Sequence, residues 1–332
     1  MAVLRTLLRK TVRQIRQIRQ LHETRNDLRS ERNALVSRLS ALAREVTDIH
    51  AARDEGRLIV TDYPYHPRRR PTNKTAGGMQ LIARLGAEED QYSAILRGIA
   101  RHSDLLRRIP YDQQDSSTPF WSNDWFPPFD GAALYGLIAE KAPRRYIEVG
   151  SGNSTRFARQ AIRDLGLNTR IVSIDPQPRV EIDALCDETV RSPMEDLPAE
   201  FWEDIGPDDM LFVDNSHRSF PNSDVTVFFT EVMPALKPGV TWGLHDICLP
   251  YDYPQEWSDR FYNEQYLLLA YLIGGAQHDE IVLPLTWAAY HPPLHDILEP
   301  LWKHEELFRS AGTRGSSFWM RKREVPSQAP TE

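Results

Sequence analysis

The sequence predicts an α/β protein in which a doubly wound, seven-stranded sheet follows a long N-terminal helix. From Trp121 onwards, short apolar runs typical of buried strands alternate with segments of helical apolar spacing. Such alternation is typical of a largely parallel sheet with helices on both faces. The first 56 residues, by contrast, show a seven-residue apolar repeat and no strand pattern.

Residues 1–56 predict one α-helix that forms a coiled coil with further copies of the chain. They contain no Pro, and their first Gly is Gly56. Two apolar sets recur with heptad spacing, the first being Leu21, Leu28, Leu35, Leu42 and Ile49, and the second Ile18, Leu39 and Val46. Arg25 and Arg32 fill the remaining seam positions and weaken this pairing. A helix packed on its own domain is the alternative.

The first twenty residues also form a basic amphipathic pattern without Asp or Glu. The apolar residues are Leu4, Leu7, Leu8, Val12, Ile15 and Ile18, and the basic ones are Arg5, Arg9, Lys10, Arg13, Arg16 and Arg19. A helix of this kind can lie on an anionic membrane surface. It can equally be the splayed end of the coiled coil.

The rest of the chain divides into a linker with a helical cap, over 57–117, and a sheet domain over 118–323. The Pro- and aromatic-rich stretch 58–75 predicts an extended linker, and 79–109 has helical spacing. Residues 324–332 are expected to be a disordered tail. Strands are expected at 145–149, 171–175, 188–191, 210–214, 241–246, 280–283 and 316–321, and helices at 130–141, 154–165, 225–236 and 261–273.

The end of the first of these strands predicts a site for a nucleoside-containing cofactor. The strand leads through Gly150 and Gly152 into a helix, and Gly lets a backbone turn tightly and approach a ligand. Asp175 ends the next strand, where a carboxylate can bind two vicinal ribose hydroxyls. Both features lie at the carboxyl ends of strands, the edge at which open α/β sheets bind ligands.

The spacing of the glycines narrows the identity of this cofactor. A dinucleotide fingerprint requires a third Gly where Thr155 stands, and a Walker A loop requires a Gly-Lys-Ser/Thr sequence that this chain lacks. The remaining pattern, Glu148-Val-Gly-Ser-Gly, resembles motif I of the class I S-adenosylmethionine-dependent methyltransferases. The resemblance implies a Rossmann-like methyltransferase sheet with an antiparallel last strand, and S-adenosyl-L-methionine as cofactor. An ordinary strand–turn–helix is the alternative.

This resemblance also implies which residues contact the cofactor. They belong to motif I, to the ends of the second and fourth strands, and to the segment after the third strand, where this superfamily usually contacts adenine. The expected set is Glu148, Gly150, Ser151, Gly152, Asn153, Ser154, Asp175, Glu195 and Asp214.

Polar side chains end the fourth and fifth strands as well. Asp214 and His217 follow one strand, and His245 and Asp246 end the other, so we expect them to converge beside the cofactor's methyl group. Carboxylate and imidazole ligands of this kind can hold a divalent metal such as Mg²⁺ or Mn²⁺.

These two motifs, Val-Asp-Asn-Ser-His and His-Asp-Ile, carry a more specific resemblance over roughly residues 118–322. They are similar to bacterial metal-dependent O-methyltransferases and to the cephalosporin-hydroxylase type of the same fold. The resemblance implies that Asp214, His245 and Asp246 are metal ligands. His245 departs from the family pattern, because a carboxylate is often found at its position.

The expected function is methyl transfer to a hydroxyl of a small molecule or glycan, assisted by a metal. His217, His245 and Asp246 are the expected catalytic residues. Without a metal, either His would be a general base oriented by Asp246, and a purely structural role is the third interpretation. Two other functions stay open: a hydroxylase-like reaction on the same fold, and a non-catalytic coiled-coil assembly protein.

Charge and composition bound the partners and the location. The formal net charge is −7, and residues 1–57 hold 13 Arg and Lys against 7 Asp and Glu, so the rest carries −13. This balance speaks against a nucleic-acid-binding catalytic face. No apolar run approaches the roughly 20 residues of a membrane span. Two cysteines are too few for a disulfide framework and favour a cytoplasmic protein. Peripheral association with the inner face of the membrane is the alternative location.

Overall fold

The computed structural model describes residues 2–178, 181–276, 279–302 and 314–324. The chain divides into two units, Met1–His66 and Pro67–Glu332. Almost all of the expected disordered tail therefore lies outside the described residues.

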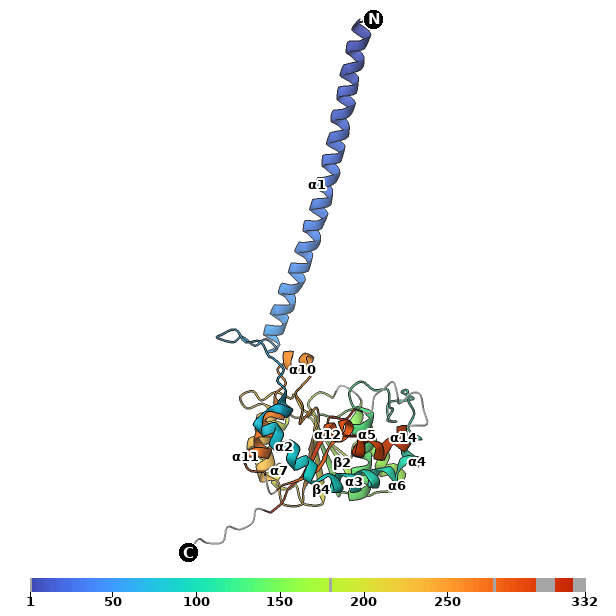
Figure 1. The fold of residues 1–332 in the computed structure, drawn as a ribbon, viewed down its shortest axis with the longest axis vertical. Helices are drawn as coiled ribbons and strands as arrows, with labels where there is room; N and C mark the ends of the chain where they lie inside the picture. Colours follow the sequence, from blue (N-terminus) through green and yellow to red (C-terminus); the bar gives the residue numbers. More distant parts are fainter. Residues whose placement is uncertain (1, 179–180, 277–278, 303–313, 325–332) are drawn as a thin grey trace. The chain divides into compact units, whose positions relative to one another are not determined.

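The first unit contains one helix, α1 (Ala2–Asp54), followed by chain without regular secondary structure (Figure 1). At a rise of 1.5 Å per residue, its 53 residues span about 80 Å. The heptad residues are exposed along it, from 47% for Ile49 to 69% for Leu21. The predicted helix is confirmed, whereas its pairing with other copies stays a prediction.

The basic pattern at the start of α1 also stays a prediction, because the side chains of residues 1–9 and 12 lie outside what the structure describes. Within the described chain, no helix is both long enough and apolar enough to cross a membrane.

The second unit is built around a seven-stranded sheet of order β3-β2-β1-β4-β5-β7-β6. Its strands are β1 (Arg145–Val149), β2 (Arg170–Ile174), β3 (Glu188–Val190), β4 (Asp209–Val213), β5 (Thr241–Leu244), β6 (Glu280–Pro284) and β7 (Phe318–Arg321). The first five strands are parallel, and β7 is antiparallel to both β5 and β6. The doubly wound sheet and its antiparallel last strand are thus confirmed.

The strand register positions the site. Val149, Ile174, Val213 and Leu244 are aligned across β1, β2, β4 and β5. The next residue of each strand therefore emerges at the same edge of the sheet, and these residues are Gly150, Asp175, Asp214 and His245. The chain order reverses between β1 and β4, so this edge includes the topological switch point at which α/β sheets bind ligands.

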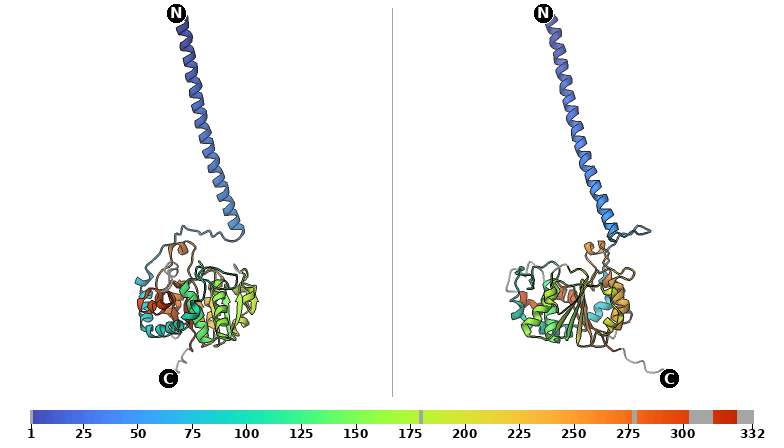
Figure 2. Two further views of the ribbon diagram at one scale, coloured as in Figure 1. Left: turned by 90° about the vertical axis from the view of Figure 1, so that its right-hand side faces the viewer. Right: turned by 180° about the vertical axis from the view of Figure 1, so that it is seen from behind.

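Helices cover both faces of the sheet (Figure 2). They are α2 (Ala76–Ala87), α3 (Glu89–Ala100), α4 (Ser103–Leu106), α5 (Pro128–Lys141), α6 (Asn153–Leu165), α7 (Ala199–Glu203), α8 (Asp224–Val227), α9 (Met233–Ala235), α10 (Gln255–Asp259), α11 (Glu264–Gly274), α12 (Leu285–Tyr290), α13 (Pro292–His295) and α14 (Glu299–Trp302). Because helices cover it on both sides, β4 is buried along its whole length, which explains its apolar sequence.

The segment 79–109, for which helical spacing was expected, forms three helices with breaks near Glu88 and Arg101. Glu88 leaves helical geometry and accepts a hydrogen bond from the Tyr92 hydroxyl (2.9 Å), and Arg101 at the second break pairs with Glu140 of α5 (2.7 Å). The second to fifth strands end one or two residues earlier than expected, so Asp175, Asp214, His245 and Asp246 lie in loops.

Candidate active site

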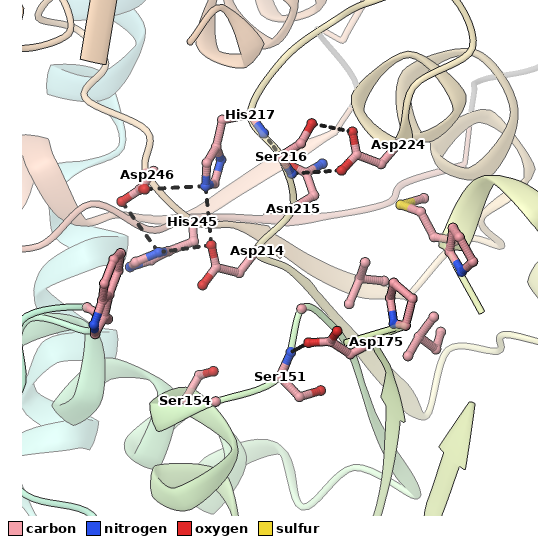
Figure 3. Close-up of a pocket in the computed structure, with 18 of the residues that line it drawn as sticks. Ser151, Ser154, Asp175, Asp214, Asn215, Ser216, His217, Asp224, His245 and Asp246 are labelled. Carbon is pink, nitrogen blue, oxygen red and sulfur yellow. Dashed lines mark hydrogen bonds and ion pairs between the residues drawn. The ribbon is translucent and has the colours of Figure 1, made fainter. Parts of the chain in front are cut away.

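A pocket of about 670 Å³ lies at the carboxyl edge of the sheet. All but one of the expected cofactor residues line it, namely Gly150, Ser151, Gly152, Asn153, Ser154, Asp175, Glu195 and Asp214. The expected catalytic residues His217, His245 and Asp246 line it as well (Figure 3). The exception is Glu148, which is fully buried behind the turn.

The turn after β1 forms because Gly150 adopts a left-handed backbone conformation. Its φ is +78°, and a Cβ there would lie 1.8 Å from the backbone oxygen of Asp214. Gly152 differs from the expectation, because its φ of 179° needs no glycine and a Cβ would meet no atom within 4 Å. Only Gly150 is required for the turn itself.

We expect Gly150→Ala to lower the free energy of unfolding by at least about 2 kcal/mol, through backbone strain and the clash with Asp214. Gly152→Ala is the matched control, and we expect it to stay within about 1 kcal/mol of the wild type. Urea unfolding of both variants measures the difference. Equal loss in the two variants would contradict this account of the turn.

Glu148 supports the turn from beneath. Its carboxylate accepts hydrogen bonds from the hydroxyls of Tyr146 (2.8 Å) and Thr155, and the Thr155 hydroxyl also accepts the N–H of Gly152 (3.0 Å). Burial raises the pKa of Glu148 from 4.5 to about 7, although the hydrogen bonds oppose this shift.

This raised pKa predicts a pH-dependent stability. Because the folded-state pKa lies above the ordinary value, ionising Glu148 costs folding free energy, and the cost grows from about pH 4.5 to about pH 7. Between pH 5 and 8 we expect the unfolding free energy to fall by about 2 kcal/mol more in the wild type than in Glu148→Gln. Urea unfolding across this range tests it, with exposed Glu181→Gln as control. Parallel pH profiles of the wild type and Glu148→Gln would refute it.

Asp175 extends into the pocket from the end of β2. Its carboxylate accepts hydrogen bonds from the backbone N–H groups of Ser151 (2.9 Å) and Gln177 (2.8 Å), one on each oxygen. Each oxygen retains a lone pair for a further donor. The two backbone bonds thus orient Asp175 and leave it able to accept from two hydroxyl groups.

His217 and His245 lie between two carboxylates at the ends of β4 and β5 (Figure 3). His217 Nε2 is 3.4 Å from Asp214 Oδ1 and 3.3 Å from Asp246 Oδ2. His245 Nδ1 is 3.4 Å from Asp214 Oδ1 and 3.5 Å from Asp246 Oδ1. His217 and Asp246 both have positive φ, of 59° and 53°. Such strained backbone persists where the surrounding structure holds it, and it is typical of functional sites.

Two further carboxylates, both fully buried, orient the imidazole rings from outside the pocket. Glu264 of α11 lies 3.0 Å from His217 Nδ1, so it directs Nε2 of this ring toward the pocket. Asp130 of α5 accepts the N–H groups of Ser316 and Ser317 and lies 3.8 Å from His245 Nε2. These supporting contacts come from segments far apart in the sequence.

The carboxylates control the charge of both imidazoles. Burial lowers the pKa of His217, but hydrogen bonds to Asp214 and Glu264 outweigh it and hold the pKa well above 6.5. The same competition between burial and carboxylates raises the pKa of His245. Burial raises the pKa of Asp246, whereas the two imidazoles hold that of Asp214 below its usual range. Without a metal, the carboxylates therefore favour the protonated form of both rings.

The cluster also fits a divalent metal. One ligand atom each from Asp214, His217 and Asp246 lies within 4.8 Å of the others. Two carboxylates and one imidazole are a ligand set for Mn²⁺ or Mg²⁺, and the Glu264 contact behind His217 is the support that metal-binding histidines have. The expected set had His245 in place of His217. In the structure the left-handed turn at His217 brings its ring between the two carboxylates.

Sequence reasoning missed several residues that line this pocket. Ser216 donates from both N–H (2.7 Å) and hydroxyl (2.6 Å) to Asp224, which begins α8. Arg218 and Arg260 line the side of the pocket near His217, beside Tyr262, which the sequence had suggested for the acceptor pocket. They come from irregular loops, where no periodic pattern could have indicated them.

One family model matches this region of the chain. Residues 147–247, which run from β1 to just beyond β5, match a model described as a methyltransferase domain. This part of the chain is thus similar to methyltransferase domains. The match and the strand order confirm the resemblance carried by motif I, while the metal-dependent branch of that resemblance stays untested.

Solved structures similar to this chain are distant from it in sequence. The methyltransferase PaMTH1 of Podospora anserina, bound to SAH, is 13% identical, covers 80% of this chain and 100% of its own, and has a TM-score of 0.37. An O-methyltransferase from Bacillus cereus, in complex with SAH, is 16% identical, covers 69% and 91%, and has a TM-score of 0.32. No curated protein is detectably similar in sequence.

Proposed function

We propose that this chain is an S-adenosylmethionine-dependent methyltransferase that acts on a hydroxyl group of a small molecule or glycan. The observation that carries the proposal is one pocket that joins the motif I turn and Asp175 to the cluster of Asp214, His217 and Asp246. The motif I turn and Asp175 suit a nucleoside cofactor, and the carboxylate–histidine cluster can promote loss of the proton from an acceptor hydroxyl.

The chain holds the cofactor through groups already in place. Asp175, oriented by Ser151 and Gln177, accepts hydrogen bonds from the two ribose hydroxyls. Met194, buried after β3, and the adjacent Glu195 lie where the adenine ring would bind. The cofactor supplies an activated methyl group when bound, and the chain's task is to align an acceptor oxygen with it.

Asp214, His217 and Asp246 would hold a divalent metal beside the acceptor, and such a metal lowers the pKa of a bound hydroxyl. Glu264 fixes the His217 ring so that Nε2 faces both carboxylates. The raised pKa of His217 makes it a weaker candidate for a metal-free general base, because the carboxylates around it favour the protonated ring, which cannot accept a proton.

Calorimetry of the full chain with S-adenosylmethionine and with NAD⁺ tests the proposal. We expect the first ligand to bind and the second to show no heat, because the third glycine of the dinucleotide fingerprint is replaced by Thr155. Absence of binding by S-adenosylmethionine would favour the non-catalytic assembly protein. Metal analysis of the purified protein separates the remaining alternative, since iron would favour hydroxylation and Mg²⁺ or Mn²⁺ methyl transfer.

A further inference from the structure

Two arginines lie beside the metal-ligand cluster and have no carboxylate partner among the residues that the structure describes. Arg218 follows β4 and Arg260 precedes α11, and both line the pocket. Their guanidinium carbons lie 5.1 and 4.8 Å from the centre of the Tyr262 ring. The same ring lies 4.7 Å from the ring of His217, so both cations are close to the cluster.

The donors of these guanidinium groups are largely unused. Arg218 donates Nε–H to the backbone oxygen of Arg260 (2.7 Å) and Nη1–H to that of Ser216 (3.0 Å). Arg260 makes no side-chain hydrogen bond to any residue that the structure describes. Throughout the described ranges, neither guanidinium comes within 4.0 Å of a carboxylate oxygen. A guanidinium has five N–H donors, so most of those on half-buried Arg218 and exposed Arg260 are not paired with any described residue.

The two cations belong to the acceptor end of the pocket. Asp175, which orients the ribose, lies on the far side of Asp214 from His217 (Figure 3). Arg218 and Tyr262 lie next to His217. A cofactor anchored at Asp175 with its methyl group at Asp214 therefore leaves the arginines for the second substrate.

We propose that Arg218 and Arg260 form a subsite for an anionic group of the methyl acceptor, either a phosphate or a carboxylate. Two guanidinium groups near one aromatic ring repel each other, and an anion that both contact would offset this repulsion while pairing their free N–H groups. The acceptor is then a phosphorylated or carboxylated hydroxyl compound rather than a neutral one. This inference rests on the proposed function and names the substrate class of the same site.

Calorimetry with matched probes tests this subsite. With S-adenosylhomocysteine bound to the full chain, we expect glucose 6-phosphate or glucuronate to bind at least about tenfold more tightly than glucose. The phosphate and carboxylate probes separate the two sources of anion. Arg218→Gln and Arg260→Gln should each remove most of this preference, while Arg97→Gln, which removes an exposed arginine outside the pocket, should leave it unchanged.

The affinity for S-adenosylhomocysteine distinguishes the possible failures. We expect it to be unchanged in Arg218→Gln and Arg260→Gln. A loss there would assign the arginines to the cofactor's own carboxylate and overturn the subsite. Normal cofactor binding without any preference for the anionic probes would also overturn it, leaving the proposed function intact. Absence of cofactor binding in the wild type would instead refute the proposed function.

The charges along α1 carry a second, independent inference about how the helix pairs. In a parallel pair, Arg25 and Arg32 at the seam would face the same residues of the partner, so like charges would meet twice. In an antiparallel pair centred between Asn33 and Ala34, residues whose numbers sum to 67 face each other. Arg25 then faces the partner's Leu42, and Arg32 faces the partner's Leu35.

The antiparallel register also pairs opposite charges beside the seam. The flanking positions then bring Glu31 next to the partner's Arg38, and the two-fold symmetry repeats this contact. In the parallel arrangement Glu31 would flank the partner's Val36 and Arg38 the partner's Ala43. The apolar residues that would be covered are exposed in the single chain, including Leu28 at 60% and Leu39 at 64%.

We infer that α1 forms an antiparallel two-helix coiled coil with a second copy of the chain. Distances between spin labels in the full chain, with Cys186 and Cys248 replaced by Ser, test the direction. For Gln20→Cys we expect labels about 40 Å apart, from 1.5 Å of rise per residue, whereas a parallel pair would bring them together. For Asn33→Cys, near the centre, we expect a short distance in either case, which controls for pairing. A short distance at residue 20, or no distance at residue 33, overturns the inference.

Charge reversal supplies a second test of the register. We expect Glu31→Arg to weaken dimerisation roughly tenfold, because two contacts become repulsive, and Arg38→Glu in the same chain to restore it. The molar mass in solution is measured by analytical ultracentrifugation at several protein concentrations. Failure of the second change to rescue the first would contradict the pairing of these two residues.

Discussion

Asp175→Ala should weaken S-adenosylmethionine binding at least about a hundredfold. The substitution removes two charge-assisted hydrogen bonds to the ribose, each worth about 1.5–3 kcal/mol, and about 1.4 kcal/mol corresponds to a factor of ten. It also removes the acceptor for the N–H groups of Ser151 and Gln177, which shapes the turn. Calorimetry on the full chain measures the affinity directly.

Two control variants separate binding from folding. Asp175→Asn keeps one oxygen acceptor for Ser151, so we expect an intermediate loss of about tenfold. Glu181→Ala removes an exposed carboxylate from the same segment outside the pocket and should leave the affinity unchanged. If Asp175→Ala binds within threefold of the wild type while remaining folded, this carboxylate does not hold the cofactor.

Asp246→Asn should weaken Mn²⁺ binding at least about a hundredfold. The substitution replaces a charged ligand by a neutral amide, and even partners behind a ligand are worth 10–100-fold in metal affinity. Asn tolerates the left-handed φ of 53° at this position, so the backbone should be retained. Calorimetric titration of the EDTA-treated protein with Mn²⁺ gives the affinity.

The two histidines provide an internal comparison for this prediction. His217→Gln should lose as much affinity for Mn²⁺ as Asp246→Asn, because His217 belongs to the group of converging ligand atoms. His245→Gln should lose less, and Glu264→Gln, which only frees the His217 ring, about tenfold. If His245→Gln instead lost more Mn²⁺ affinity than His217→Gln, His245 would be the metal ligand, as the sequence suggested. If the wild-type protein bound no Mn²⁺, the metal-assisted mechanism would be wrong and the metal-free one would be favoured.

The sheet and its functional edge could be predicted because they depend on local patterns. Apolar strands alternate with helices whatever their partners, and Gly150 and Asp175 stand at strand ends that any parallel sheet brings to one edge. The breaks near Glu88 and Arg101 could not be predicted in this way. Glu88 leaves helical geometry and Arg101 pairs with Glu140 of α5, and local helical spacing contains no information about either feature.

By itself, the sequence determined the α/β class, the long N-terminal helix and the place of the cofactor turn, since each follows from periodicity or from fixed spacing along the chain. Only the tertiary structure decided how the polar residues at that edge act. Glu148 lies behind the turn, and His217 is turned toward the pocket by Glu264. Arg218 and Arg260 meet on one tyrosine ring. The physical reason is that side-chain direction and burial depend on packing between segments distant in the sequence.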